Sequence, residues 1–130
     1  MPRITVVNDN PDFLELARDV LESEHHEATA IDMDTPDTLE RIRASRPDLL
    51  IIDLLLGNPG GEGWRLAQQA RSLPGLEGLP LLLCSADLQG LSEIEPAVSE
   101  TARAETLAKP FAIEELTAAI DRLLDERMRG

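Results

Sequence analysis

The stretch Leu49-Leu50-Ile51-Ile52-Asp53 places a carboxylate directly after four aliphatic residues, inside an apolar run that continues to Leu56. A continuous aliphatic run of this length is typical of a parallel strand that is covered on both faces. Burying a carboxylate without a partner is strongly unfavourable, so we expect a cation close to Asp53. The stretch therefore predicts the central strand of an α/β domain, with Asp53 at its carboxyl end.

Short apolar runs alternate with helical patterns along the rest of the chain, which is typical of a parallel sheet covered by helices. Two further runs are almost entirely apolar and suit central strands, whereas two weaker runs, which mix in Thr and Glu and have fewer large aliphatic residues, suit edge strands. The five predicted strands are residues 4–7, 28–31, 49–52, 79–84 and 104–108.

Apolar residues at helical spacing predict a helix after each strand. Asn10-Pro11 and Thr35-Pro36 are start signals, the third helix should begin near Trp64, and Gly90 and Pro96 interrupt the fourth pattern. The inward-facing residues are predicted to be Phe13, Ala17, Val20 and Leu21; Leu39 and Ile42; Ala67 and Ala70, with Trp64 as a core anchor; Leu88, Leu91, Ile94 and Val98; and Ile113, Leu116, Ile120 and Leu123.

Length and charge limit the classes of function. The 130 residues, 42% of them hydrophobic, are enough for one domain over residues 1–130, with no room for a second. A net charge of -13 opposes direct binding to nucleic acid or to an anionic membrane. The chain starts without the apolar stretch of a secretion signal, and its apolar runs are too short to span a bilayer. We therefore expect a soluble cytoplasmic protein.

Two residue types that often carry chemistry are more simply structural here. Cys84 ends an apolar run and is expected to be a small buried side chain, although a lone thiol could act as a nucleophile. His25 and His26 lack the further Cys or His ligands of a metal site and are expected to cap the first helix.

Polar side chains leave four of the predicted strands. In an open parallel sheet these ends lie at one edge, where ligands bind. Lys109 is the only lysine among twelve basic residues, and a compact ammonium suits a small anion site. The carboxylates of Asp9 and Asp53, at adjacent strand ends, would repel one another unless a divalent cation such as magnesium lay between them. Singly, these side chains could be a helix cap, a turn residue or a solvated charge; together they could bind a phosphoryl group. The polar residues at the strand ends are Asn8 and Asp9 after the first strand, Asp53 after the third, Ser85 after the fourth and Lys109 after the fifth.

In their order and spacing, four segments resemble the receiver domain of two-component response regulators, over essentially the whole chain. They are Val6-Val7-Asn8-Asp9-Asn10-Pro11, Pro47-Asp48-Leu49-Leu50-Ile51-Ile52-Asp53, Cys84-Ser85-Ala86 and Lys109-Pro110-Phe111. The resemblance implies a flavodoxin-like three-layer sandwich, with a five-stranded parallel sheet of order 2-1-3-4-5 and five helices. It also implies a chemotaxis-type single-domain response regulator in a two-component phosphorelay.

The resemblance implies a role for each polar residue. Asp53 would accept a phosphoryl group from a phosphohistidine on a sensor histidine kinase or a phosphotransfer protein. Asp9, Asp53 and the backbone carbonyl of Leu55 would bind Mg²⁺ directly, and Asn8 would act through a bound water.

Beyond the metal site, Ser85 would donate to a phosphoryl oxygen and Lys109 would pair with the phosphoryl group. The Lys109-Pro110 bond is usually cis in this family. Such a protein is not an enzyme beyond its own phosphoryl transfer and dephosphorylation, and it would signal to a separate, unknown downstream protein as a monomer or a weak homodimer.

Four departures from the family pattern keep other functions open. Asn8 replaces a usually acidic residue, which predicts weaker magnesium binding, and Thr106 stands where an aromatic switch is usual. The loop at residues 57–63 looks about two residues longer than usual, and the fourth helix is irregular. One alternative is a phosphorylation-independent receiver-like interaction module. Another, a phosphatase of the haloacid dehalogenase type, would require an acidic residue in place of Leu55 and a cap domain.

Overall fold

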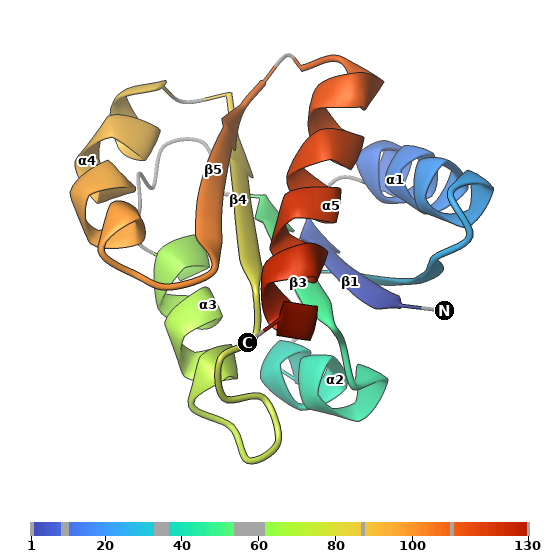
Figure 1. The fold of residues 1–130 in the computed structure, drawn as a ribbon, viewed down its shortest axis with the longest axis horizontal. Helices are drawn as coiled ribbons and strands as arrows, with labels where there is room; N and C mark the ends of the chain where they lie inside the picture. The colour runs from blue at the N-terminus through green and yellow to red at the C-terminus, as the bar shows by residue number, and fades with distance from the viewer. Residues whose placement is uncertain are drawn as a thin grey trace.

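The computed structural model describes residues 2–8, 11–32, 37–53, 62–86, 88–109 and 111–129. Strands and helices alternate along these residues (Figure 1), and none of these helices is long and apolar enough to span a membrane. The elements are β1 (Arg3–Asn8), α1 (Pro11–Ser23), β2 (Glu27–Asp32), α2 (Thr38–Ser45), β3 (Leu49–Asp53), α3 (Glu62–Arg71), β4 (Leu81–Ser85), α4 (Leu88–Ser99), β5 (Ala104–Ala108) and α5 (Ile113–Arg129).

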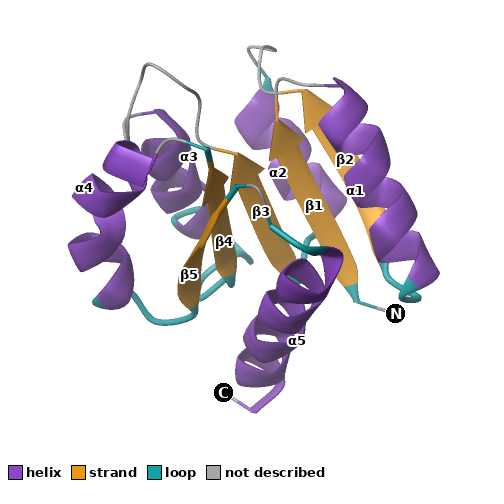
Figure 2. Ribbon diagram, turned by 90° about the horizontal axis from the view of Figure 1, so that it is seen from above, coloured by secondary structure: helices purple, strands orange, loops and turns teal. Residues whose placement is uncertain are grey.

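The five strands form one parallel sheet of order β2-β1-β3-β4-β5. Helices cover both faces, with α1 and α5 on one and α2, α3 and α4 on the other (Figure 2). The predicted strand order, edge strands and three-layer α/β/α sandwich are therefore confirmed.

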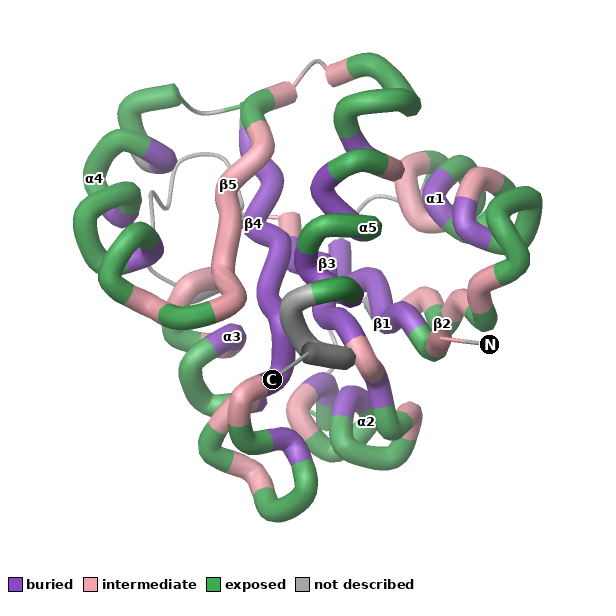
Figure 3. Tube along the Cα trace, viewed as in Figure 1, coloured by how far each residue is buried: buried purple, intermediate pink, exposed green. Residues whose placement is uncertain are grey.

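The core consists of two clusters, one on each face of the sheet, because alternate residues of the central strands point to opposite faces. Leu50 and Ile52 face α2, α3 and α4, whereas Leu49 and Ile51 face α1 and α5. The chain of β3 and β4 is largely buried, whereas β5 is only partly buried (Figure 3). As predicted, Trp64 packs against the first cluster.

Two predicted core residues are exposed instead. Leu88 is 65% exposed and Ile113 is 54% exposed. They are the first residues of α4 and α5, at the carboxyl edge of the sheet, where the helix starts before the sheet can cover it. The buried stripe of each helix begins one turn later, at Leu91 and Leu116.

Helix boundaries agree with the sequence patterns in most places. The helix α3 begins at Glu62, two residues before Trp64, and α4 continues through Pro96 despite the backbone hydrogen bond that a proline removes. After α1, His25 adopts φ 66° and the N–H of His26 donates to the Leu21 carbonyl, which caps the helix as predicted. The signals at Asn10, at Thr35-Pro36 and in residues 57–61, and the bond to Pro110, lie outside the described residues.

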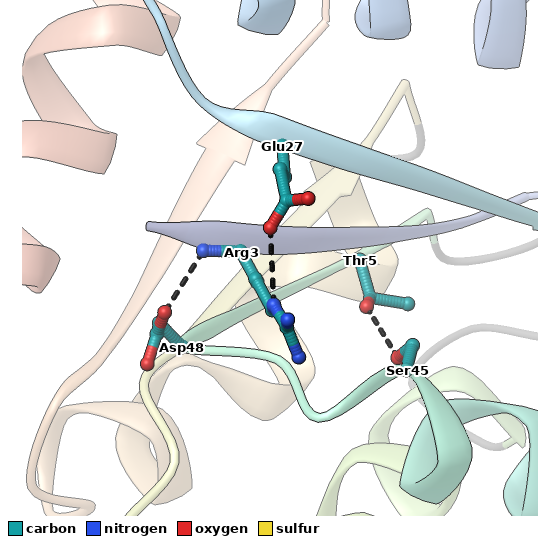
Figure 4. A network of polar contacts seen from close by, with 5 residues as sticks. All are labelled: Arg3, Thr5, Glu27, Ser45 and Asp48. Atoms are coloured by element: carbon teal, nitrogen blue, oxygen red, sulfur yellow. Dashed lines mark hydrogen bonds and ion pairs between the residues drawn. The ribbon is translucent and has the colours of Figure 1, made fainter. Parts of the chain in front are cut away.

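At the amino ends of the strands, polar contacts connect β1 to its neighbours (Figure 4). The Arg3 side chain pairs with Glu27 at 3.0 Å, and the Arg3 N–H donates to the Asp48 carboxylate at 2.8 Å. The Thr5 and Ser45 hydroxyls lie 2.7 Å apart. The sheet is thus anchored by polar contacts at one edge, and the candidate site lies at the opposite one.

Candidate functional site

The sheet brings four of the predicted site residues to its carboxyl edge. Asn8, Asp53 and Ser85 are the last residues of β1, β3 and β4, and Lys109 directly follows β5. Asp53 is in register with Cys84, and Ser85 with Ala108, so the strands end at nearly the same level. The remaining two predicted residues, Asp9 and Leu55, lie outside the described residues.

The cation expected beside Asp53 is Lys109. Its Nζ lies 2.9 Å from Asp53 Oδ1, and the two side chains are 23% and 13% exposed. The Lys109 N–H donates to the Ser85 carbonyl at 2.8 Å, which extends the β4–β5 ladder by one residue. That backbone bond fixes the point from which the lysine side chain reaches across β4 toward β3.

A second group contacts the ammonium of Lys109. Its Nζ lies over the ring of Phe13, 4.1 Å from the ring centroid, which is within the range of a cation–π interaction. The spacing of Phe13 in the sequence predicts a core residue and no more. Its position in the first turn of α1, the helix that leaves the same edge of the sheet, was the available signal.

The two neutral polar residues of the site are buried. Asn8 is fully buried and Ser85 is 1% exposed. A neutral amide is far less costly to bury than a carboxylate, which agrees with the presence of Asn rather than Asp at the end of β1. Val7 and Ile52, the residues that precede Asn8 and Asp53, pair with each other, so Asn8 and Asp53 end adjacent strands at the same level.

Cys84 is buried beside this site and is structural in character. Burial, and secondarily the nearby charge of Asp53, raise the pKa of the Cys84 thiol to about 12, with Lys109 acting weakly in the opposite direction. A thiol that stays protonated and inaccessible is a poor nucleophile, so the expectation of a small buried side chain is confirmed.

The residues of this edge fit a hard cation in ligand type. Asp53 offers a carboxylate and Asn8 an amide oxygen, and oxygen donors are what Mg²⁺ prefers. Within the described ranges, no group of three or more His, Cys, Asp or Glu side chains could hold a metal ion. Among the described residues, Asp53 would therefore supply only part of a ligand set, with the amide of Asn8 beside it.

Thr106, which stands where an aromatic switch residue is usual in the family, makes a polar contact with a helix. Thr106 in β5 donates a hydrogen bond to Glu95 of α4 at 2.8 Å. The preceding residue, Glu105, accepts two hydrogen bonds from Arg122 of α5, the shorter at 2.8 Å. Strand β5 is thus joined by side chains to a helix on each face of the sheet.

Known proteins share this sequence pattern and fold. Protein Rrf1 of Nitratidesulfovibrio vulgaris is 32% identical over 132 residues, covering 98% of this chain and 86% of that protein. The sensor histidine kinase TmoS of Ectopseudomonas mendocina is 30% identical over 99% of this chain, but this match spans only 13% of TmoS. A hybrid signal transduction histidine kinase of Dictyostelium discoideum is likewise matched over 8% of its length.

Solved structures agree in fold. A CheY-like response regulator receiver domain protein from Methanospirillum hungatei JF-1 has a TM-score of 0.79 and 24% identity, over 99% of this chain and 98% of that one. The receiver domain of the sensor histidine kinase PA1611 from Pseudomonas aeruginosa PAO1, solved with a magnesium ion coordinated in its active site cleft, has a TM-score of 0.76 and 23% identity, over 95% and 98%.

The family model of the response regulator receiver domain matches residues 4–121, which include every polar strand-end residue of the site. The chain belongs to the response regulator receiver domain family.

Proposed function

We propose that this receiver domain, over residues 1–130, acts in two-component phosphorelay signalling by accepting a phosphoryl group on Asp53. The domain would act in the cytoplasm, and the donor would be a phosphohistidine of a sensor histidine kinase or of a phosphotransfer protein. The observation that carries the proposal is the ammonium of Lys109, 2.9 Å from the Asp53 carboxylate at the carboxyl edge of the sheet. A poised carboxylate beside a cation is what phosphoryl transfer to an aspartate requires.

In the proposed reaction, a carboxylate oxygen of Asp53 attacks phosphorus. The new O–P bond forms as the N–P bond to histidine breaks, and the freed imidazole keeps the electron pair and takes up a proton. Lys109 neutralises charge on the phosphoryl oxygens, and the Ser85 hydroxyl donates a hydrogen bond to one of them after transfer. The domain is thus a phosphoprotein that promotes only its own modification and its reversal.

We propose Mg²⁺ as the cofactor, held by Asp53, Asp9 and the Leu55 carbonyl, with Asn8 acting through a bound water. When bound, the ion would neutralise negative charge on the phosphoryl group during transfer. The oxygen ligands at this edge support this, as does the magnesium ion in the cleft of the PA1611 receiver domain. Because Asn8 supplies no charge, we expect weaker magnesium binding than an acidic residue would give.

Incubation with acetyl phosphate, with and without magnesium, tests the proposal. We expect the intact mass to increase by one phosphoryl group in the wild type and in Asp121→Asn, whose exposed carboxylate serves as the matched control. The Asp53→Asn variant should stay unmodified. A beryllofluoride salt should change the Trp64 fluorescence only when both magnesium and Asp53 are present.

If Asp53→Asn were modified like the wild type, or the wild type were never modified, the proposal would be wrong. The second outcome would favour a receiver-like module that binds its partner without phosphorylation. In either case, the domain would bind a downstream protein and would be a monomer or a weak homodimer. Light scattering before and after phosphorylation measures the oligomeric state.

A further inference from the structure

The ammonium of Lys109 has neighbours on two different elements. Oδ1 of Asp53, at the end of β3, lies 2.9 Å away, and the Phe13 ring of α1 lies below it with its centroid 4.1 Å from Nζ. The Lys109 side chain is only 23% exposed, so solvent screens these two contacts only weakly. We propose that Phe13 is a positioning residue, whose ring keeps the Lys109 ammonium at the phosphoryl site; this rests on the function proposed above.

The ring contact differs from the ion pair in its response to phosphorylation. Attaching a phosphoryl group turns Asp53 into an acyl phosphate, in which one carboxylate oxygen becomes the bridging oxygen to phosphorus. The charge that attracted Nζ then moves outward onto the phosphoryl oxygens. Lysine has a long, flexible stem, so its ammonium would be free to leave with the displaced charge or to enter solvent. The face of Phe13 is unchanged by the reaction and continues to attract the cation.

An aromatic ring also suits this position for an electrostatic reason. A carboxylate would hold the ammonium more strongly, and acidic residues are abundant in this chain, with 25 Asp and Glu in total. A carboxylate would also repel the incoming phosphoryl group and neutralise the cation that is meant to bind it. The quadrupole of a ring attracts the ammonium without adding net charge to the site.

Packing holds the ring in place. Phe13 is partly buried against the cluster formed by α1, α5 and one face of the sheet, so its orientation is set by the fold. This packing is also the competing explanation, because a core residue would occupy the same place without acting on Lys109. The test must therefore separate apolar volume from the aromatic face.

Lysine-selective isotope labelling provides that separation, because Lys109 is the only lysine and gives a single ε-methylene signal. In the wild type we expect the ring current of Phe13 to shift this signal upfield. Phe13→Leu, which keeps apolar volume, should move it to the position of a free lysine, and Phe13→Tyr should leave it in place. Phe111→Leu is the matched control, since it removes the other phenylalanine, which packs on the same cluster.

The rate of phosphorylation by acetyl phosphate is the second measurement. We expect Phe13→Leu to slow it about fivefold, as the loss of a partly desolvated cation–π contact implies, and Phe13→Tyr to retain the wild-type rate. If Phe13→Leu does not fold, Phe13→Met, whose flexible side chain adapts to irregular cavities, takes its place.

An unmoved lysine signal or an unchanged rate in Phe13→Leu would overturn the inference, as would a Phe13→Tyr variant as slow as Phe13→Leu. These outcomes differ from failure of the proposed function. In that case no variant would be phosphorylated, the wild type included, while the lysine signal would still report whether the ring contacts the ammonium.

Discussion

Replacing Asp53 by Asn and Lys109 by Met, singly and together, measures how strongly this ion pair stabilises the fold. At 2.9 Å and an effective dielectric constant of about 20, Coulomb's law gives an attraction of about 6 kcal/mol. Desolvating the two charges and ordering the lysine side chain oppose most of that attraction. Because the side chains are only 13% and 23% exposed, we expect a coupling energy of about 2 kcal/mol, above the value of about 1 kcal/mol or less for an exposed pair.

The chain offers a matched control. Arg3 and Glu27 lie 3.0 Å apart, nearly the same distance, but their side chains are 51% and 57% exposed (Figure 4). Arg3→Met and Glu27→Gln, singly and together, should therefore give a coupling energy of less than about 1 kcal/mol. The two cycles differ mainly in burial, so their difference isolates the effect of solvent screening.

Urea unfolding in the presence of a chelator is the assay, followed by fluorescence of Trp64, the only tryptophan and partly buried against the core. Double-mutant cycles then give the coupling free energies. High salt, about 1 M, should remove most of the Arg3–Glu27 coupling and leave most of the Asp53–Lys109 coupling. Equal coupling energies, or equal sensitivity to salt, would refute the view that burial makes the site pair strong.

Three further predictions concern neighbouring features. Burial raises the Cys84 pKa from an ordinary 9.0 to about 12, so the unfolding free energy should fall as pH rises between these values; in urea unfolding, Cys84→Ala should make that fall shallower by at most roughly 1 kcal/mol per pH unit. Asn8→Asp buries a new charge and should cost about 1–3 kcal/mol without magnesium, but should tighten magnesium binding in a Trp64 fluorescence titration; unchanged affinity would contradict this. Ile120→Ala should cost about 2–5 kcal/mol in urea unfolding, whereas exposed Ile113→Ser should change stability by less than about 0.5 kcal/mol.

Much of this fold could be predicted because local patterns and topology agree. The aliphatic runs of the central strands have few alternatives, and right-handed crossovers then bring the strand ends to one edge. The same logic predicted a cation beside Asp53, since a carboxylate in such a strand needs one. Lys109 was recognisable because it is the only lysine and lies at a strand end.

What could not be predicted depends on how a helix sits over the end of the sheet. Periodicity shows which side of α5 is apolar, but not that its first residue, Ile113, lies at the edge of the covered region. Likewise, Phe13 fits a core stripe by its spacing, and only the placement of α1 reveals its contact with Lys109. In α4, burial of Leu91, Ile94 and Val98 outweighs the local penalty of Pro96.

The two side-chain links of β5 have a consequence for local unfolding. Thr106 is hydrogen-bonded to α4 and Glu105 to α5. Because successive residues of a strand point to opposite faces, the two links lie on opposite sides of the sheet. An edge strand ordinarily opens more readily than the centre of a sheet. Here, opening β5 breaks one contact in each helical layer, so amide exchange in this strand reports on the docking of both layers at once.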